Sequence, residues 1–95
     1  MSTRSTVLQI TASGQGTDWL PVQAGPYSVS VQGFFVGVIA LQRQLDGLAA
    51  EDIKVYTDQA AETLLAAEDQ KLRLYVYPGD LQSGVITARI GQDKR

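Results

Sequence analysis

The 95-residue chain contains no cysteine and no histidine. Without cysteine it can form neither a disulfide framework nor a thiolate zinc site, and without histidine it lacks the commonest general base and metal ligand of proteins. These absences remove the side chains on which most nucleophilic, acid–base and metal-dependent catalysis depends. The sequence therefore predicts a protein that is not an enzyme and that binds no cofactor.

Carboxylates are the remaining acid–base groups, and they occur as neighbours at residues 51–52 and 68–69. Adjacent strand residues point to opposite faces of a sheet, so neither pair is expected to converge in one cleft as glycoside hydrolysis requires. Calcium binding would need oxygen ligands from turns, and Asp18, Asp46 and Asp80 fall in different loops. We interpret all these carboxylates as solvated turn charges.

A large charge of one sign is also missing, because eight lysines and arginines oppose ten aspartates and glutamates for a net charge of −2. Such a chain has no basic field to hold nucleic acid. The longest apolar run, residues 34–41, is too short to cross a bilayer, and the polar residues 1–6 do not resemble a targeting segment. We expect synthesis in the cytoplasm and no nucleic-acid or membrane partner.

The composition is that of a folded domain, with 44% hydrophobic and 19% charged residues. A chain of this length can bury one core but not two. We predict a flexible arm at residues 1–6, a single domain at residues 7–91 and a polar tail at residues 92–95.

Alternation of apolar and polar residues is the dominant pattern of the chain. A period of two indicates a strand with one buried face, and it is seen in residues 7–12, 27–32, 53–57, 71–77 and 85–90. The residues predicted to face the core in the clearest of these strands are Leu8, Ile10, Ala12, Tyr27, Val29, Val31, Leu72, Leu74, Val76, Ile86, Ala88 and Ile90. Roughly six to eight short strands separated by turns predict an all-β fold, either an antiparallel β-sandwich or a jelly-roll-like small barrel.

Two segments depart from simple alternation. Residues 33–43 are apolar on both faces, as in a strand covered on two sides, although Gly37 should weaken it unless a bulge or a close neighbour needs the space. Residues 58–70 contain alanines and leucines that favour a helix by propensity. Because the flanking segments are extended, we favour a strand there over a helical turn.

Two outward-facing groups of residues are candidates for a protein interface: Phe34, Val36, Val38, Arg73, Tyr75 and Tyr77. In so short a chain, apolar residues on a second face need another sheet or another subunit to cover them. An alternative is a sugar-binding platform formed by Trp19, Tyr75 and Tyr77. A third interpretation makes Trp19 a plug at a sheet edge and the tyrosines ordinary cross-strand neighbours.

Two stretches resemble a known family. Residues 37–47, GVIALQRQLDG, resemble the G-x-V-x-L-Q-R-S-x-D-G-G strand and turn of small β-sandwich structural proteins of tailed bacteriophages. Residues 72–74 and 82–91, LRL and QSGVITARIG, resemble the Y-R-L…Y-x-S-G-T-V-x-V-R-L-G ending of the same proteins. The chain departs from the pattern at Gln44 and Leu48, where serine and a second glycine are usual, and at Leu72, where tyrosine is usual.

The resemblance implies a non-enzymatic virion protein that decorates or cements the capsid, with the major capsid protein or tail proteins as partners. It transfers no catalytic residue. Two alternatives stay open: a tail or head–tail accessory, and a carbohydrate-binding or host-adhesion module that uses the surface aromatics. The apolar residues expected on a second face also predict a symmetric homo-oligomer, such as a trimer, in which multivalency turns modest contacts into persistent attachment.

Overall fold

The computed structural model describes residues 3–45 and 49–93, and within them the protein consists of strands and connecting loops without a helix. The strands are β1 (Thr3–Ile10), β2 (Leu20–Val22), β3 (Gly25–Gln32), β4 (Phe35–Gly37), β5 (Ile39–Gln44), β6 (Glu51–Tyr56), β7 (Ala60–Ala66), β8 (Gln70–Tyr75), β9 (Leu81–Gly84) and β10 (Ile86–Asp93). The predicted all-β class is confirmed. The described residues form ten strands rather than roughly six to eight, because the predicted strand at 33–43 is divided in two and the short strands β2 and β9 are additional.

The chain folds back on itself between β5 and β6, so that its two halves pair as an antiparallel ribbon. β1 pairs with β10, β2 with β8, β3 with β7, and β5 with β6. When this ribbon rolls up, β10 meets β3 and β8 meets β5. The result is two four-stranded sheets, sheet A (β1-β10-β3-β7) and sheet B (β2-β8-β5-β6), with the connectivity of a jelly roll.

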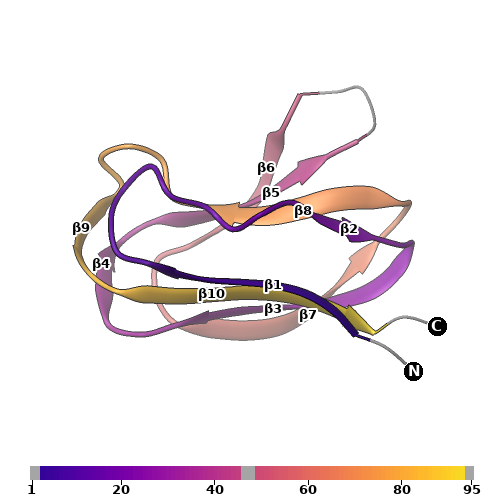
Figure 1. Ribbon diagram of the computed structural model, residues 1–95, viewed down its shortest axis with the longest axis horizontal. Helices are drawn as coiled ribbons and strands as arrows, with labels where there is room; N and C mark the ends of the chain where they lie inside the picture. The colour runs from indigo at the N-terminus through magenta and orange to yellow at the C-terminus, as the bar shows by residue number, and fades with distance from the viewer. Residues whose placement is uncertain (1–2, 46–48, 94–95) are drawn as a thin grey trace.

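The two sheets form the layers of a sandwich, and a separate two-stranded sheet of β4 and β9 closes one end of it (Figure 1). The start of β1 and the end of β10 lie together at the opposite end (Figure 1). Part of the hairpin of β5 and β6 extends away from the body of the sandwich (Figure 1). Within residues 3–45 and 49–93, no helix is long and apolar enough to cross a membrane.

The core lies between sheets A and B and is built from alternate strand positions. The largest fully buried side chains are Ile10, Val29, Val31, Ile39, Leu41, Leu72, Leu74, Val76, Ile86 and Ile90. The inward residues predicted for 27–32, 71–77 and 85–90 are all buried, which confirms the face assignment of those strands. Ala12, predicted to face the core, is exposed instead because β1 ends at Ile10.

The preference for a strand within residues 58–70 is correct: residues 60–66 form β7, which is the edge of sheet A. Its inward residue Glu62 accepts a hydrogen bond from the Tyr56 hydroxyl (2.6 Å) and pairs with the Lys54 ammonium (2.6 Å). Both partners lie on β6, the edge of sheet B, so this cluster joins the two edge strands. An inward-pointing charge also discourages the pairing of another chain along an edge.

Sheet A extends further toward both ends of the chain than the predicted domain. β1 begins at Thr3 and pairs residue by residue with β10, which runs to Asp93. The segments predicted as an arm and a tail therefore contribute residues 3–6 and 92–93 to the sheet, where their backbone groups find ladder partners. The rest of the predicted arm and tail lies outside the described residues.

Gly37 marks the division of the predicted strand at 33–43. The β4–β9 pairing shifts register between Val36 and Gly37, and a Cβ atom at Gly37 would overlap the carbonyl oxygen of Asp80. The next residue, Val38, donates its backbone N–H to that same oxygen (2.8 Å). The close neighbour predicted for this glycine is therefore the carbonyl group of Asp80.

Candidate functional site

The outer face of sheet B carries a group of large polar and aromatic side chains, which we call the Arg73 cluster. It consists of Trp19, Gln42, Asp52, Arg73, Tyr75 and Tyr77. The register of the sheet creates it, because Gln42 on β5 lies opposite Arg73 on β8 and opposite Asp52 on β6. These three side chains form one row across adjacent strands, with a cation at one end and an anion at the other.

Hydrogen bonds run along this row without a break. The Arg73 Nε–H donates to Gln42 Oε1 (2.7 Å), and Gln42 Nε2 donates to Asp52 Oδ1 (2.9 Å) and to the Tyr77 oxygen (2.7 Å). The Tyr77 hydroxyl in turn donates to Asp52 Oδ1 (2.9 Å). Gln42 is only 3% exposed, and a carboxamide with a donor at its oxygen and acceptors at its nitrogen can hold a single orientation.

The hydrogen bond that the Tyr77 hydroxyl donates to Asp52 favours its neutral form. Its hydrogen bond to Asp52 raises the pKa of Tyr77, and partial desolvation and the Asp52 charge act in the same direction. The proton on Tyr77 is needed for the bond to the carboxylate, so the cluster keeps this arrangement through the neutral pH range.

Two aromatic rings fix the plane of the Arg73 guanidinium. Its central carbon lies 4.5 Å from the centroid of the Trp19 ring and 4.6 Å from that of Tyr75. Tyr77 packs against Tyr75 edge to face, with centroids 5.1 Å apart and ring planes at 85°. Neither of the two salt bridges among the described residues involves Arg73, and its terminal nitrogens donate to no acceptor in that part of the chain.

The structure brings together four of the residues proposed from the sequence, namely Trp19, Arg73, Tyr75 and Tyr77. These residues do not form a flat platform for a sugar. The rings of Tyr75 and Tyr77 are close to perpendicular, and the Arg73 guanidinium lies over the rings of Trp19 and Tyr75. Sequence reasoning missed Gln42 and Asp52. A polar residue at the end of a run that is otherwise apolar on both faces was the available clue to Gln42.

The other three proposed residues, Phe34, Val36 and Val38, lie outside the Arg73 cluster on or beside β4. Phe34 is 89% exposed and Val36 57%, and Val85 of the β9–β10 connection is 37% exposed. The Val85 backbone N–H donates to the Phe34 carbonyl (3.0 Å), so these residues lie together beside the pair of β4 and β9. That pair closes one end of the sandwich (Figure 1). We call Phe34, Val36 and Val85 the apolar end.

Glycine permits the tight backbone approach at the apolar end. Gly84 has φ of +94° and pairs with Phe35, and a Cβ atom on it would overlap the carbonyl oxygen of Phe34. Gly33, with φ of +113°, meets the Val85 carbonyl in the same way. The turn that presents Phe34 is therefore packed against the β9–β10 connection rather than extended into solvent.

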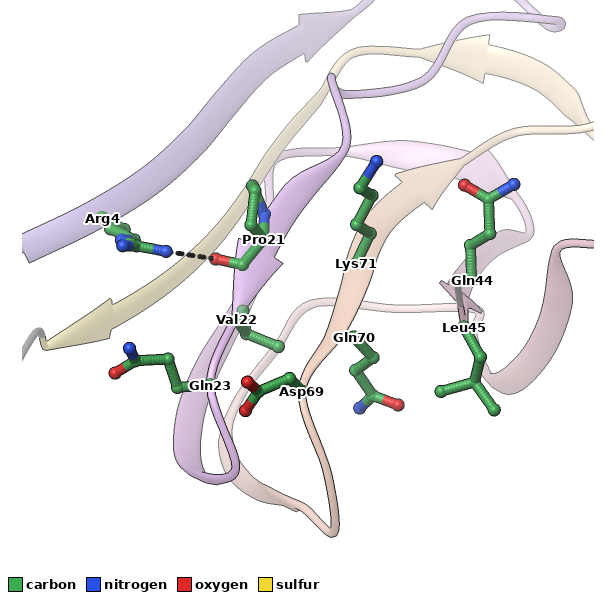
Figure 2. Close-up of a pocket in the computed structure, with 9 residues that line it drawn as sticks. All are labelled: Arg4, Pro21, Val22, Gln23, Gln44, Leu45, Asp69, Gln70 and Lys71. Atoms are coloured by element: carbon green, nitrogen blue, oxygen red, sulfur yellow. Dashed lines mark hydrogen bonds between the residues drawn. The ribbon is translucent and has the colours of Figure 1, made fainter. Parts of the chain in front are cut away.

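A cavity of about 490 Å³ lies near the end where β1 begins. Figure 2 shows its lining, which consists of Arg4, Pro21, Val22, Gln23, Gln44, Leu45, Asp69, Gln70 and Lys71. Arg4 donates to the Pro21 carbonyl (3.4 Å), and Asp69 accepts the backbone N–H of Ala24 (2.9 Å). Lys71 and Gln44 point away from the direction taken by Gln70 (Figure 2), so the polar groups do not converge on one point.

The neighbouring carboxylates do not converge, as expected, but the interpretation as turn charges is wrong for Glu51 and Asp52, which lie in β6. Glu51 pairs with Arg43 while Asp52 joins the Arg73 cluster, and Asp69 caps a backbone N–H at the β2–β3 connection. In the part of the chain that the structure describes, no three acidic side chains gather closely enough to hold a metal ion.

Comparison of the chain with models of protein families, with curated proteins and with solved structures gave no match. The chain's own surface, with the apolar end and the Arg73 cluster, therefore provides the structural evidence on function.

Proposed function

We propose that this protein is a non-enzymatic structural protein of a bacteriophage virion, which decorates or cements the capsid through contacts with the major capsid protein. The motifs at residues 37–47 and 82–91 support the proposal through their resemblance to small virion β-sandwich proteins. The jelly-roll connectivity agrees with it, since viral capsid domains use this architecture, as do lectins. Fold alone does not decide between these uses, so a surface must carry the argument.

The observation that carries the proposal is the apolar end. Phe34 exposes 89% of its surface although the core between the sheets is closed. Covering a phenylalanine side chain contributes about 1.5–3 kcal/mol, and the two valines add to this. Because the glycines at positions 33 and 84 hold the turn in place, little conformational entropy is lost when a partner covers it.

Repetition would turn this modest contact into stable attachment. A capsid offers many equivalent positions, and copies that also contact one another bind with far greater avidity than one copy alone. A tail or head–tail accessory protein would use the same contacts at another place on the particle, so location distinguishes the two roles.

The test is to purify phage particles that carry the protein and to compare wild type with Phe34→Ser. The matched control is Leu65→Ser, which removes an exposed leucine (76% exposed) from the distant strand β7. We expect wild type and Leu65→Ser to remain on particles and Phe34→Ser to be lost, with a particle reconstruction placing the protein on the capsid surface. Absence of the wild-type protein from particles would refute the virion role, and density on the tail alone would refute the capsid role.

A further inference from the structure

We infer that the outer face of sheet B is a self-complementary surface on which a second copy of this chain docks about a two-fold axis. In this arrangement, Arg73 of each copy faces Asp52 of the other. The inference goes beyond the virion role and can be tested on the isolated protein. It follows from three properties of the Arg73 cluster: a fixed cation, a half-used anion, and an aromatic surround.

The cation is already held in a binding geometry. The Trp19 and Tyr75 rings and the bond from Nε to Gln42 fix the guanidinium, while its terminal nitrogens have no acceptor among residues 3–45 and 49–93. A guanidinium with both terminal nitrogens available matches a carboxylate in a bidentate pair. Since the side chain is ordered before binding, little rotamer entropy is lost on docking.

The Asp52 carboxylate is also held in place, but hydrogen bonds reach only one of its two oxygens among the described residues. Asp52 Oδ1 accepts hydrogen bonds from Gln42 and Tyr77, whereas Oδ2 accepts none within the described ranges. Asp52 is exposed, so its second oxygen is accessible to an incoming donor. Arg73 and Asp52 therefore do not neutralise each other, because Gln42 lies between them, and the exposed Lys71 adds a second cation two residues before Arg73 on the same face.

The spacing of these charges suits a two-fold interface. Arg73 and Asp52 lie on strands two positions apart in sheet B, which separates their backbones by about 10 Å. A two-fold axis in the plane of the face that passes between them carries each Arg73 onto the opposing Asp52. In an isologous contact of this kind every pairing occurs twice, so Arg73 and Asp52 of both copies are matched.

Aromatic and aliphatic side chains surround the row and can exclude water from it. Tyr77 is 40% exposed and Val55 of β6 is 54% exposed, and Trp19 and Tyr75 are partly exposed. Tryptophan, tyrosine and arginine are the residue types that dominate binding energy at protein interfaces. Charge matching selects the partner, while this surround supplies the apolar contact.

The test is a charge-complementation experiment by sedimentation equilibrium. Arg73→Glu places acidic residues at both ends of the row and Asp52→Arg places basic residues at both ends, so each variant alone should repel itself, with its dimer dissociation constant raised at least about 100-fold. An equimolar mixture of the two variants should form a heterodimer with an affinity close to that of wild type. Circular dichroism and thermal unfolding verify that each variant folds. If either variant fails to fold, the same experiment is done with Arg73→Gln and Asp52→Asn, which remove the charges without reversing them.

The matched control is Arg89→Glu, which makes the same change in net charge on the outer face of sheet A and should leave association unchanged. The proposal is overturned if wild type stays monomeric at about 1 mM, a concentration at which even a weak complex forms. It is also overturned if Arg89→Glu weakens association as much as Arg73→Glu, or if the mixture fails to associate. A monomer whose attachment to particles depends on Arg73 would assign the face to an acidic patch of another virion protein instead.

These outcomes are independent of the virion test. Phe34→Ser alters the apolar end and should leave the dimer intact, whereas Arg73→Glu should abolish the dimer without altering the apolar end. Failure of one proposal therefore leaves the other standing.

Discussion

Among the described residues, the outer faces of sheets A and B each carry one arginine, Arg89 and Arg73, and the two have different surroundings. On sheet A, small neighbours such as Ser28 and Ser30 surround Arg89, which lies flat on its own sheet: a Cβ atom at Gly91 would be 2.6 Å from its terminal nitrogen. On sheet B, large rings hold Arg73 with its terminal nitrogens unpaired in the described part of the chain. Arg89 thus covers its own sheet, whereas the terminal nitrogens of Arg73 have no acceptor among the described residues.

Both faces depend on the one core that sheets A and B share. A charge placed in this core should therefore have the largest effect on stability. Val31 supports sheet A and Leu74 supports sheet B, and both are 0% exposed. Val31→Asp or Leu74→Asp should each lower the free energy of unfolding by more than about 4 kcal/mol, because the carboxylate has no partner. Chemical denaturation measures this, with Thr87→Asp on the exposed face as control. Near-wild-type stability of either core variant would contradict the assignment of the faces.

Removal of the central amide of the Arg73 row should have the next largest effect. Gln42→Leu leaves the Arg73 Nε–H without its acceptor and Asp52 without one of its donors, which should lower the free energy of unfolding by about 1–3 kcal/mol. Gln32→Leu, at an exposed position on sheet A, should change it by less than about 0.5 kcal/mol. Equal effects in denaturant titrations would mean that the row contributes nothing to the fold.

Tyr75→Ala should separate folding from association. It removes one ring beside Arg73, a contact worth about 0.5–1 kcal/mol at a partly exposed site, so the monomer should remain folded. The same variant should weaken self-association measurably, because the guanidinium loses part of its support. Thermal unfolding and sedimentation report the two quantities, and an unfolded Tyr75→Ala chain would show that this ring belongs to the core.

The smallest expected effect concerns the edge where the two sheets meet. Hydrogen bonds from Lys54 and then Tyr56 lower the pKa of Glu62 below its usual value of 4.5. The ionised carboxylate therefore stabilises the fold at neutral pH, and this contribution is lost as the pH falls below about 4.5 through the lowered pKa. The stability difference between wild type and Glu62→Gln should shrink over that range in denaturant titrations. A difference that does not vary between pH 7 and about pH 2 would contradict this assignment.

Much of the fold follows from local sequence pattern. Alternation of side chains identifies the buried positions of β3, β8 and β10, and the extended context of residues 58–70 correctly outweighs their helical propensity. Gly37 also pointed to a close neighbour, which is the Asp80 carbonyl. These features depend on each residue and its immediate neighbours in the chain, so they can be seen without knowledge of pairing.

The functional face could be predicted only in part. The outward positions of Arg73 and Tyr75 follow from the period of their strand, but their partners depend on register. Gln42 meets Asp52 because the β5–β6 pairing shifts register between Leu41 and Gln42, and no local pattern specifies such a bulge. The extension of sheet A to residues 3 and 93 was also missed. The ends of β1 and β10 are polar, so their strand structure is evident from their pairing with each other and not from a hydrophobic pattern in either segment.

Trp19, the only tryptophan in the chain, lies against Arg73 on the face that we assign to association. Its fluorescence therefore tests the account most directly when emission and acrylamide quenching are followed as protein concentration increases. The account predicts a shift to shorter wavelength and reduced quenching as copies associate, both absent in Arg73→Glu and retained in Arg89→Glu. Association without any change at Trp19, or emission that is the same at every concentration, would contradict it.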